Sequence, residues 1–402
     1  MKRILISTSV MVLLIGLSIS NLFAHSPLEK QTGSAKMDVY SVNENLYSFA
    51  FSCLNGVTKD HSNVNNMVSP FGNYVLLSSL ALGSVGETQR QLCNALSIKN
   101  IDDALLLKLK NQGDVLYSRS ELRLLNTIWL QKGFQLNATY VDRLKQSLRG
   151  NIREIDFNMP ETIQQINNWV NIETDGLITK IFDTLSSDTQ LVLSNIIAFK
   201  GDWKNAFDPS LTKQGEFNNL DGTKSAVQMM TQKNNYRYYE GTNYQWLEMP
   251  YQNDTFSMIV LLPNSDQTFA DFEKGWKSVL LENGDKNAEM KKINVSFPKF
   301  SVSMDYDLIP ALQSMGINSI FTSQANFKPM TEANDVMVSQ VRQSLVLKVD
   351  EKGTQATAVT AAEVLPKSVP QETFFNVDRP FFFLIRENQT GTILFMGRII
   401  NM

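Results

Sequence analysis

A stretch of twelve residues near the C-terminus has the composition of a β-strand but leads directly into a protease-sensitive sequence. Residues 354–365 contain neither Pro nor Gly and are dominated by Ala, Thr and Val, so they are free to pair within a sheet. Side chains alternate between two faces, and the face that begins at Thr354 is small and uncharged. Residues 366–370 read Pro-Lys-Ser-Val-Pro, in which two prolines hold the chain extended around a basic residue. The segment therefore suits both a sheet and a trypsin-like protease.

An Ala/Thr-rich run is also common in surface helices and ordinary strands, so this stretch alone does not identify a fold. Two blocks beyond it carry a more specific pattern. Residues 375–386 read Phe-Asn-Val-Asp-Arg-Pro-Phe-Phe-Phe-Leu-Ile-Arg, and residues 390–399 read Thr-Gly-Thr-Ile-Leu-Phe-Met-Gly-Arg-Ile. Together they resemble the C-terminal signature of the serpins. Further blocks match the family's pattern in the same order: 68–70, 82–88, 166–176, 195–207, 229–230, 258–263, 298–300 and 315–321. The resemblance covers essentially everything after about residue 38.

The resemblance implies an α+β fold with a single large domain, residues 38–402. It also implies three β-sheets, about eight or nine helices and an exposed reactive-centre loop at about residues 351–373. The sequence pattern agrees, because helical and strand patterns are mixed without regular βαβ alternation. A Ser/Gly-rich linker, a long charge run and an internal repeat are all missing from the sequence, which favours one domain.

Local patterns predict several of the helices and strands. Ser41 and Glu44 have capping-box spacing, which predicts that the first helix starts there. Other helices are predicted at 70–82 and 163–177. Strands are predicted at 122–130, 190–199, 257–262, 293–302, 344–349, 381–385 and 393–399. The last two strands are mostly apolar and predict a hairpin that is buried on both faces.

The serpin pattern also assigns a hinge and a reactive bond. The family's hinge reads Glu, any residue, Gly, Thr or Ser, and then small residues. The matching residues here follow the inhibitory version of that pattern: Glu351, Gly353, Thr354, Gln355, Ala356, Thr357 and Ala358. At the family's spacing, the attacked carbonyl belongs to Lys367 and the leaving amine to Ser368.

The mechanism implied by the resemblance is suicide inhibition. A protease serine attacks Lys367, and residues 354–366 then enter the main sheet before water releases the acyl-enzyme. Positions that resemble the sheet-opening region are Ser69, Asn195, Trp203 and Gln343, with Lys299 expected to pair with Glu351. The chain departs from the family's pattern at two of its positions. Gly72 replaces the usual second serine after Ser-Pro, and Gln343 replaces a common histidine.

Two other serpin functions stay open. Non-inhibitory serpins act as carriers, chaperones or storage proteins and usually have a bulky or charged residue in the hinge, so Thr354 and Ala356 argue against that class. Some serpins inhibit cysteine proteases, and Lys367 is compatible with such a target. The preferred prediction is a covalent complex with a trypsin-like serine protease.

Enzymatic chemistry has little support in this sequence. The chain contains two histidines, and the one outside the N-terminal segment, His61, lies in a polar, loop-like run. A Ser-His-Asp or Cys-His mechanism would depend on it. Neither metal-ligand spacing nor a glycine-rich phosphate loop is present. We therefore predict a protease inhibitor without metal or cofactor.

The N-terminus has the pattern of a secretory signal peptide. Lys2 and Arg3 precede a mostly apolar run that ends near Phe23 and Ala24, which predicts a signal peptide at residues 1–24 and a variable segment at 25–37. The run approaches membrane-spanning length, so a signal anchor is the alternative. The polar residues within the run and the small residue at its end favour cleavage. We expect secretion, either extracellular or periplasmic in a bacterium, and no membrane association after processing.

The remaining partners are constrained by charge and by cysteine content. The formal net charge is −3 and basic clusters are missing, which argues against nucleic acid as a partner and leaves a monomer as the expectation. Cys53 lies on the apolar side of a helical pattern, which favours a small core residue. A disulfide between Cys53 and Cys93 is the alternative.

Overall fold

The computed structural model describes residues 35–149, 151–186, 188–279, 285–333, 336–353 and 372–402. In these ranges the helices are α1 (Ala35–Asp60), α2 (Pro70–Leu82), α3 (Gly86–Ala95), α4 (Asp103–Tyr117), α5 (Ala138–Leu148), α6 (Thr162–Glu173), α7 (Phe269–Val279), α8 (Asp285–Asn287) and α9 (Ile309–Ser314). The strands are β1 (Asn66–Val68), β2 (Leu122–Gln131), β3 (Asn151–Ile155), β4 (Leu191–Phe199), β5 (Lys213–Asn218), β6 (Lys224–Glu240), β7 (Tyr244–Pro250), β8 (Phe256–Pro263), β9 (Glu289–Pro298), β10 (Phe300–Asp307), β11 (Val338–Val349), β12 (Thr373–Asn376), β13 (Phe381–Glu387) and β14 (Ile393–Ile399). The predicted α+β class is confirmed.

The strands in the described ranges form two hydrogen-bonded sheets. The smaller sheet has the order β10-β11-β4-β2-β3, and its neighbouring strands β11 and β4 run parallel. The larger sheet has the order β1-β14-β13-β8-β7-β6-β9-β12, with β5 paired to β6. Three sheets were expected. Two are found because the 17-residue strand β6 belongs to two groups of paired strands at once. It pairs with β5 and β9 along most of its length and with β7 at its C-terminal end. These pairings join the two groups into one sheet.

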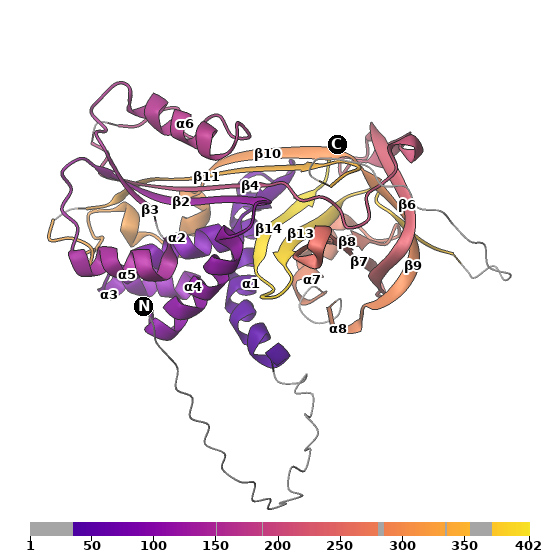
Figure 1. Ribbon diagram of the computed structural model, residues 1–402, viewed down its shortest axis with the longest axis horizontal. Helices are drawn as coiled ribbons and strands as arrows, with labels where there is room; N and C mark the ends of the chain where they lie inside the picture. The colour runs from indigo at the N-terminus through magenta and orange to yellow at the C-terminus, as the bar shows by residue number, and fades with distance from the viewer. Residues whose placement is uncertain (1–34, 150, 187, 280–284, 334–335, 354–371) are drawn as a thin grey trace, which may run out of the picture.

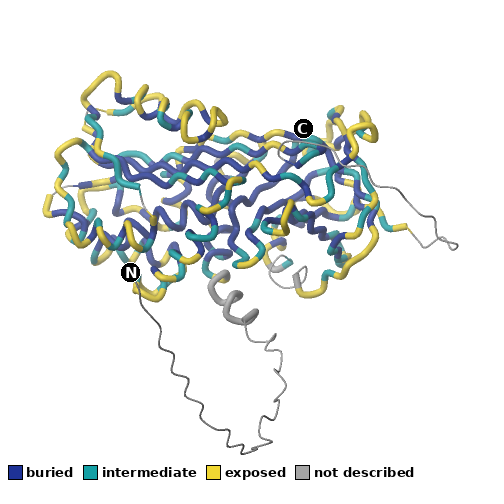
Figure 2. Tube along the Cα trace, viewed as in Figure 1, coloured by how far each residue is buried: buried dark blue, intermediate teal, exposed yellow. Residues whose placement is uncertain are grey.

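Both faces of the five-stranded sheet are covered, by different elements. Helix α6 lies over one face, and the other face packs on helices and on the larger sheet (Figure 1). Val192 and Ile196 of β4 contact the α6 side, whereas Leu193 and Ile197 point into the main core. Every residue of β4 is therefore buried, and Figure 2 shows the same burial along the centre of this sheet.

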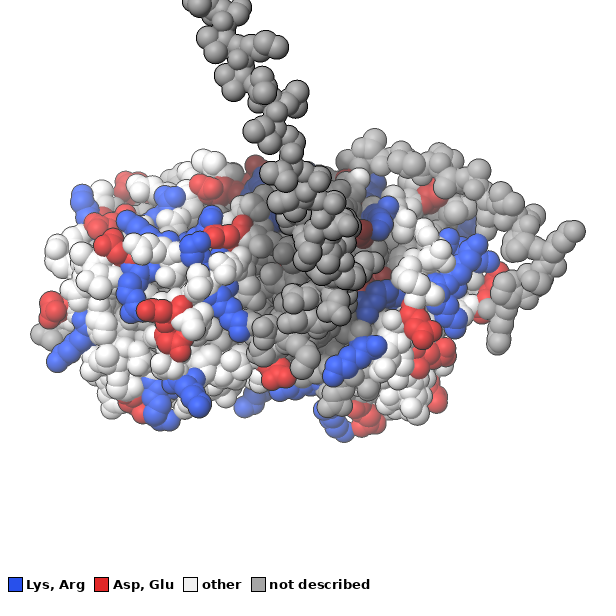
Figure 3. All heavy atoms as spheres, turned by 60° about the horizontal axis from the view of Figure 1, so that its bottom comes forward, with Lys and Arg blue, Asp and Glu red and all other residues white. Residues whose placement is uncertain are grey.

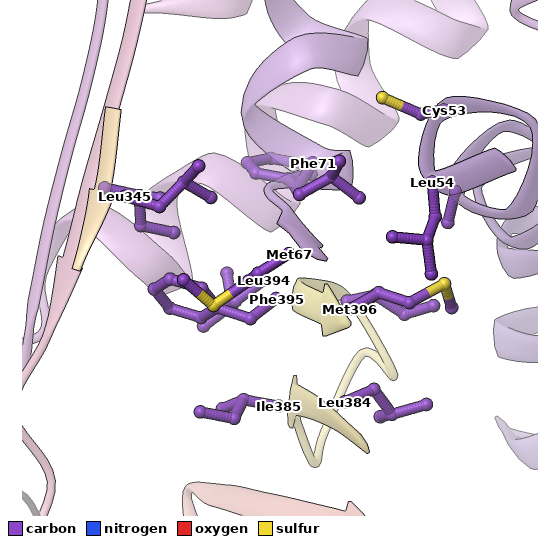
Figure 4. Close-up of a cluster of buried hydrophobic side chains, with 14 of the residues drawn as sticks. Cys53, Leu54, Met67, Phe71, Leu345, Leu384, Ile385, Leu394, Phe395 and Met396 are labelled. Atoms are coloured by element: carbon purple, nitrogen blue, oxygen red, sulfur yellow. The ribbon is translucent and has the colours of Figure 1, made fainter. Parts of the chain in front are cut away.

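The predicted hairpin of β13 and β14 is confirmed and lies in the middle of the main core. Phe381 pairs with Ile399, and all seven residues of β14 are buried. Leu394, Phe395 and Met396 pack in the same core as Phe71 of α2 (Figure 4). A continuous apolar run folds in this way because neither face of the hairpin reaches solvent.

Several local predictions were wrong by a few residues. Helix α1 begins at Ala35, so Ser41 lies inside the helix and does not cap it. The strand predicted at 293–302 is two strands, because the chain leaves the larger sheet at the end of β9 and enters the smaller sheet with β10, with Lys299 between them.

Cys53 and Cys93 are both buried free thiols, which confirms Cys53 as a core residue and excludes the disulfide between them.

Candidate functional site

The described residues of the predicted site fall into two groups. The first group lies where β4 and β11 end and contains Glu351, Gly353, Trp203 and Lys299. Ser69, Asn195 and Gln343 lie near the middle of the same sheet. The remaining predicted residues lie outside the described residues: Thr354, Gln355, Ala356, Thr357, Ala358, Lys367 and Ser368.

The backbone that precedes Thr354 is held by Trp203. The parallel strands β4 and β11 end beside each other, at the pair Phe199 and Leu347, so the segments that follow them stay adjacent. The Trp203 backbone N–H donates to Lys352 O at 2.7 Å, and its indole Nε1–H donates to Asp350 O at 3.0 Å. The indole is buried and stacks on the Tyr251 ring with centroids 4.4 Å apart. Trp203 therefore fixes the hinge to the end of β4.

Gly353 occupies a position that no other residue fits. Its φ is 123°, a region that side chains rarely adopt. A Cβ there would lie 2.3 Å from Gly201 O and 2.5 Å from Trp203 N. Gly353 and Asp350 exchange two backbone hydrogen bonds, at 3.0 and 3.2 Å, which close a tight turn directly after β11. The chain therefore turns back at this glycine, just before residue 354.

Glu351 is tied to the body of the protein by three hydrogen bonds. Lys299 Nζ lies 2.7 Å from its Oε2, so the expected ion pair is present, and Thr212 Oγ1 donates to its Oε1 at 2.8 Å. Phe207 N donates to the Glu351 carbonyl at 2.7 Å. Burial of the carboxylate acts to raise its pKa, but the hydrogen bonds from Lys299 and Thr212 outweigh that effect, and the pKa lies below its usual value. Glu351 is therefore ionised at neutral pH.

This lowered pKa predicts a pH-dependent contribution to stability. Because the pKa in the folded protein is below the usual 4.5, the contribution is present above about pH 4.5 and is lost as the pH falls through the lower folded value. We expect Glu351→Gln to be less stable than the parent by about 1 kcal/mol at pH 7, with a smaller deficit near pH 3. Denaturant unfolding at both pH values measures this difference. As a control, Glu216→Gln removes a solvent-exposed ion pair with Lys224 and should change little at either pH. A Glu351→Gln deficit that persists unchanged at pH 3 would contradict the assignment.

A row of polar side chains crosses the middle of the five-stranded sheet. Asn195 Nδ2 donates to Asn126 Oδ1 at 2.6 Å, and Gln343 Nε2 donates to Asn195 Oδ1 at 2.7 Å. The three residues face one another in register on β2, β4 and β11, and all are buried. Ser69 N completes the row at the start of α2 with a bond of 3.4 Å to Gln343 Oε1. These bonds stabilise the pairing of β4 with β11, because separating the strands would leave buried amides unpaired.

Gly72 makes room for this row. A Cβ at Gly72 would lie 2.0 Å from Asn195 Nδ2 and 2.8 Å from Asn195 Cγ. The departure from the family's serine at this position is therefore matched by the side chain of Asn195, which occupies the space that a serine would use.

Gly72→Ser is expected to destabilise the protein. The new side chain would displace the Asn195 amide and break its bonds to Asn126 and Gln343, at a cost of about 1–3 kcal/mol. The shift in the denaturation midpoint measures this cost. Gly275→Ser is the matched control, because Gly275 is also helical and a Cβ there meets no atom within 4 Å. If the two variants are equally stable, the proposed clash is wrong.

Sequence reasoning missed several residues of the site. Asn126 is a buried amide in the apolar strand β2, and Tyr306 of β10 lies in register with Gln343 and donates its hydroxyl to Asn66 Oδ1 at 3.3 Å. Thr212 was missed as a partner of Glu351. An amide in the middle of a mostly apolar strand was the available signal for Asn126, whereas nothing in the local sequence marks Thr212.

The described part of the chain offers little for other chemistry. No three His, Cys, Asp or Glu side chains in it are grouped closely enough to hold a metal ion. His61 is exposed in a loop. None of the described helices has both the length and the apolar character needed to cross a bilayer.

Comparisons with known proteins agree on one family. The family model described as serpin (serine protease inhibitor) matches residues 44–402. An uncharacterized serpin-like protein of Thermococcus kodakarensis is 32% identical over 381 residues, which cover 92% of this chain and 87% of that protein. The crystal structure of native protease nexin-1 with heparin is similar with a TM-score of 0.81 and 27% identity, over 90% of this chain and 100% of the other. Human thyroxine-binding globulin complexed with its ligand is similar with a TM-score of 0.80 and 27% identity, over 90% and 99% of the chains.

Proposed function

The chain belongs to the serpin family, and from that membership we propose that it is a secreted inhibitor that forms a covalent complex with trypsin-like serine proteases. In this proposal the protease cleaves after Lys367, Ser368 is the leaving residue, and residues 354–366 enter the five-stranded sheet. Residues 1–24 act as the signal peptide. The matching family model is described as a serine protease inhibitor, and a mouse protein Z-dependent protease inhibitor is 32% identical to this chain.

The observation that carries this proposal is the place where the hinge is held. The turn at Gly353 follows β11, which is parallel to its neighbour β4. A strand that continues from Gly353 between them would run antiparallel to both. Insertion would therefore replace one parallel ladder with two antiparallel ladders, which are slightly more stable per residue.

The energetics indicate where the driving force arises. The thirteen residues 354–366 could gain ten or more hydrogen bonds worth about 1 kcal/mol each. Ordering them costs about 1–2 kcal/mol per residue, so the new hydrogen bonds alone do not drive insertion. Serpin loop insertion is a known example of strain stored in a fold and released by proteolysis. We infer that the uncut protein is strained elsewhere and that cleavage releases this strain.

Incubation with trypsin tests the proposed function. A complex that survives denaturing electrophoresis is expected, together with a cleaved form whose thermal midpoint is higher than that of the intact protein. Complete turnover of the chain with free, active trypsin would contradict inhibition. An unchanged midpoint after cleavage would contradict the strained uncut state.

A second candidate function is that of a non-inhibitory carrier. It is favoured by the similarity to thyroxine-binding globulin, a structure solved with thyroxine. The small hinge residues Thr354 and Ala356 argue against it, since non-inhibitory hinges usually carry a bulky or charged residue. The same trypsin experiment separates the two functions, because a carrier would be cut without forming a complex.

A further inference from the structure

One end of the larger sheet presents an exposed face that the mechanism above does not use. We call it the β9 face and define it by Lys233 of β6, Met290, Lys292 and Asn294 of β9, and Phe374 of β12. Asn294 lies in register with both Lys233 and Phe374, and strand alternation places Met290 and Lys292 on the same side as Asn294. The face is thus continuous over three neighbouring strands.

The β9 face combines positive charge with exposed apolar side chains. Lys233 and Lys292 are the basic residues of the face, and Arg237 lies in register with Met290 on the same side. Lys233 pairs with Glu372, and Arg237 pairs with Glu248. Figure 3 shows Lys and Arg side chains interspersed with Asp and Glu side chains on the face that it draws. Met290 is 67% exposed and Phe374 is 52% exposed. Large exposed apolar residues of this kind are typical of a protein-binding surface.

The chain that follows the reactive bond returns to the sheet on this face. Glu372 is the first described residue after the loop, and its carboxylate lies 2.6 Å from Lys233 Nζ and 3.4 Å from Asn294 Nδ2. The hydrogen bond from Lys233 lowers the pKa of Glu372, so this contact is ionic at neutral pH. The start of the face is therefore fixed relative to the last residues of the loop.

The length of the loop then places the protease. Glu372 lies four positions after Ser368, and an extended chain spans at most about 14 Å over four steps. A protein domain of about 200 residues has a radius of gyration of about 16 Å. A protease that holds the reactive bond is thus too large to avoid the surface around Glu372.

We propose that the β9 face is a second contact surface for the protease, outside the reactive bond. It fits a protease that carries acidic side chains and an apolar patch on the side of its active site that binds residues after the cleaved bond. Charge of this kind raises the association rate more than it lowers the dissociation rate. The inference rests on the proposed inhibitory function.

A matched pair of variants tests this inference. Lys292→Glu reverses a charge on the β9 face, whereas Lys291→Glu makes the same change one residue earlier. The Lys291 side chain points the other way, with Nζ 5.3 Å from the ring centroid of Tyr238. With anionic trypsin at low ionic strength, we expect Lys292→Glu to lower the rate constant for complex formation about tenfold and Lys291→Glu to stay within about twofold of the parent. The loss should shrink as salt is added.

Phe374→Ala tests the apolar part of the face, and we expect a lower rate constant that is insensitive to salt. Equal rates for the Lys292→Glu and Lys291→Glu variants would overturn the inference while leaving inhibition intact, as long as the covalent complex still forms. A Lys292→Glu deficit that is unchanged in 1 M salt would also overturn it, since screened charges would then not explain the effect. Failure of the parent protein to form any complex would overturn the proposed function itself.

Discussion

Replacing Thr354 with Arg is expected to convert the protein from an inhibitor of trypsin into a substrate. Thr354 directly follows Gly353, so its side chain would be the first to enter the space between β4 and β11. A guanidinium there would lose its hydration without gaining a partner, at a cost of several kcal/mol. Insertion would slow accordingly, and water would release the acyl-enzyme first. Mass spectrometry should find cleavage after Lys367, and an activity assay should recover free trypsin.

Gln355→Arg is the matched control for this variant. Strand alternation places Gln355 on the opposite face of the inserted strand, which also carries the charged Glu363. We expect this control to retain most of the covalent complex. Full complex formation by the Thr354→Arg variant would contradict the insertion mechanism, because the loop would then act through surface binding alone.

Lys367→Glu is expected to abolish the complex with trypsin and to leave the fold intact. The specificity pocket of a trypsin-like protease is acidic, and it rewards an ammonium group while excluding a carboxylate. We expect the rate constant for complex formation to fall by roughly 10⁴. Inhibition kinetics measure this change, and the unfolding midpoint of the intact variant should match that of the parent.

Lys367→Arg serves as the control, because it keeps the positive charge at the assigned position. This variant should form the complex at a rate close to that of the parent. If Lys367→Glu still forms the complex at the parent rate, the reactive bond is assigned to the wrong residue.

The elements that could be predicted are those whose pattern is local. Pro70 marks the start of α2, and the apolar runs of β13 and β14 predict a doubly buried hairpin. The pairing of Lys299 with Glu351 followed from the family resemblance, since 52 positions separate the two residues in the chain. Resemblance thus supplied a contact that periodicity alone could not.

The features that were missed depend on long-range register. Asn126 meets Asn195 only because β2 and β4 pair with a particular alignment, which no pattern within either strand specifies. Strand β6 likewise joins two groups of strands into one sheet only because it pairs with β9 along much of its 17 residues and with β7 at its end. The sequence of β6 does not specify these partners. The sequence reveals that Gly72 replaces a serine, but the reason lies in a side chain from another strand.

That shared space has an evolutionary consequence. A Cβ at position 72 would lie 2.0 Å from the Asn195 amide nitrogen, so a side chain at position 72 requires the Asn195 side chain to be shorter or to take another direction. The two positions should therefore covary among close homologues, and a double-mutant cycle on Gly72→Ser and Asn195→Ala should show a favourable coupling energy. We therefore expect two positions that lie 123 residues apart in the chain to be coupled in their effect on stability.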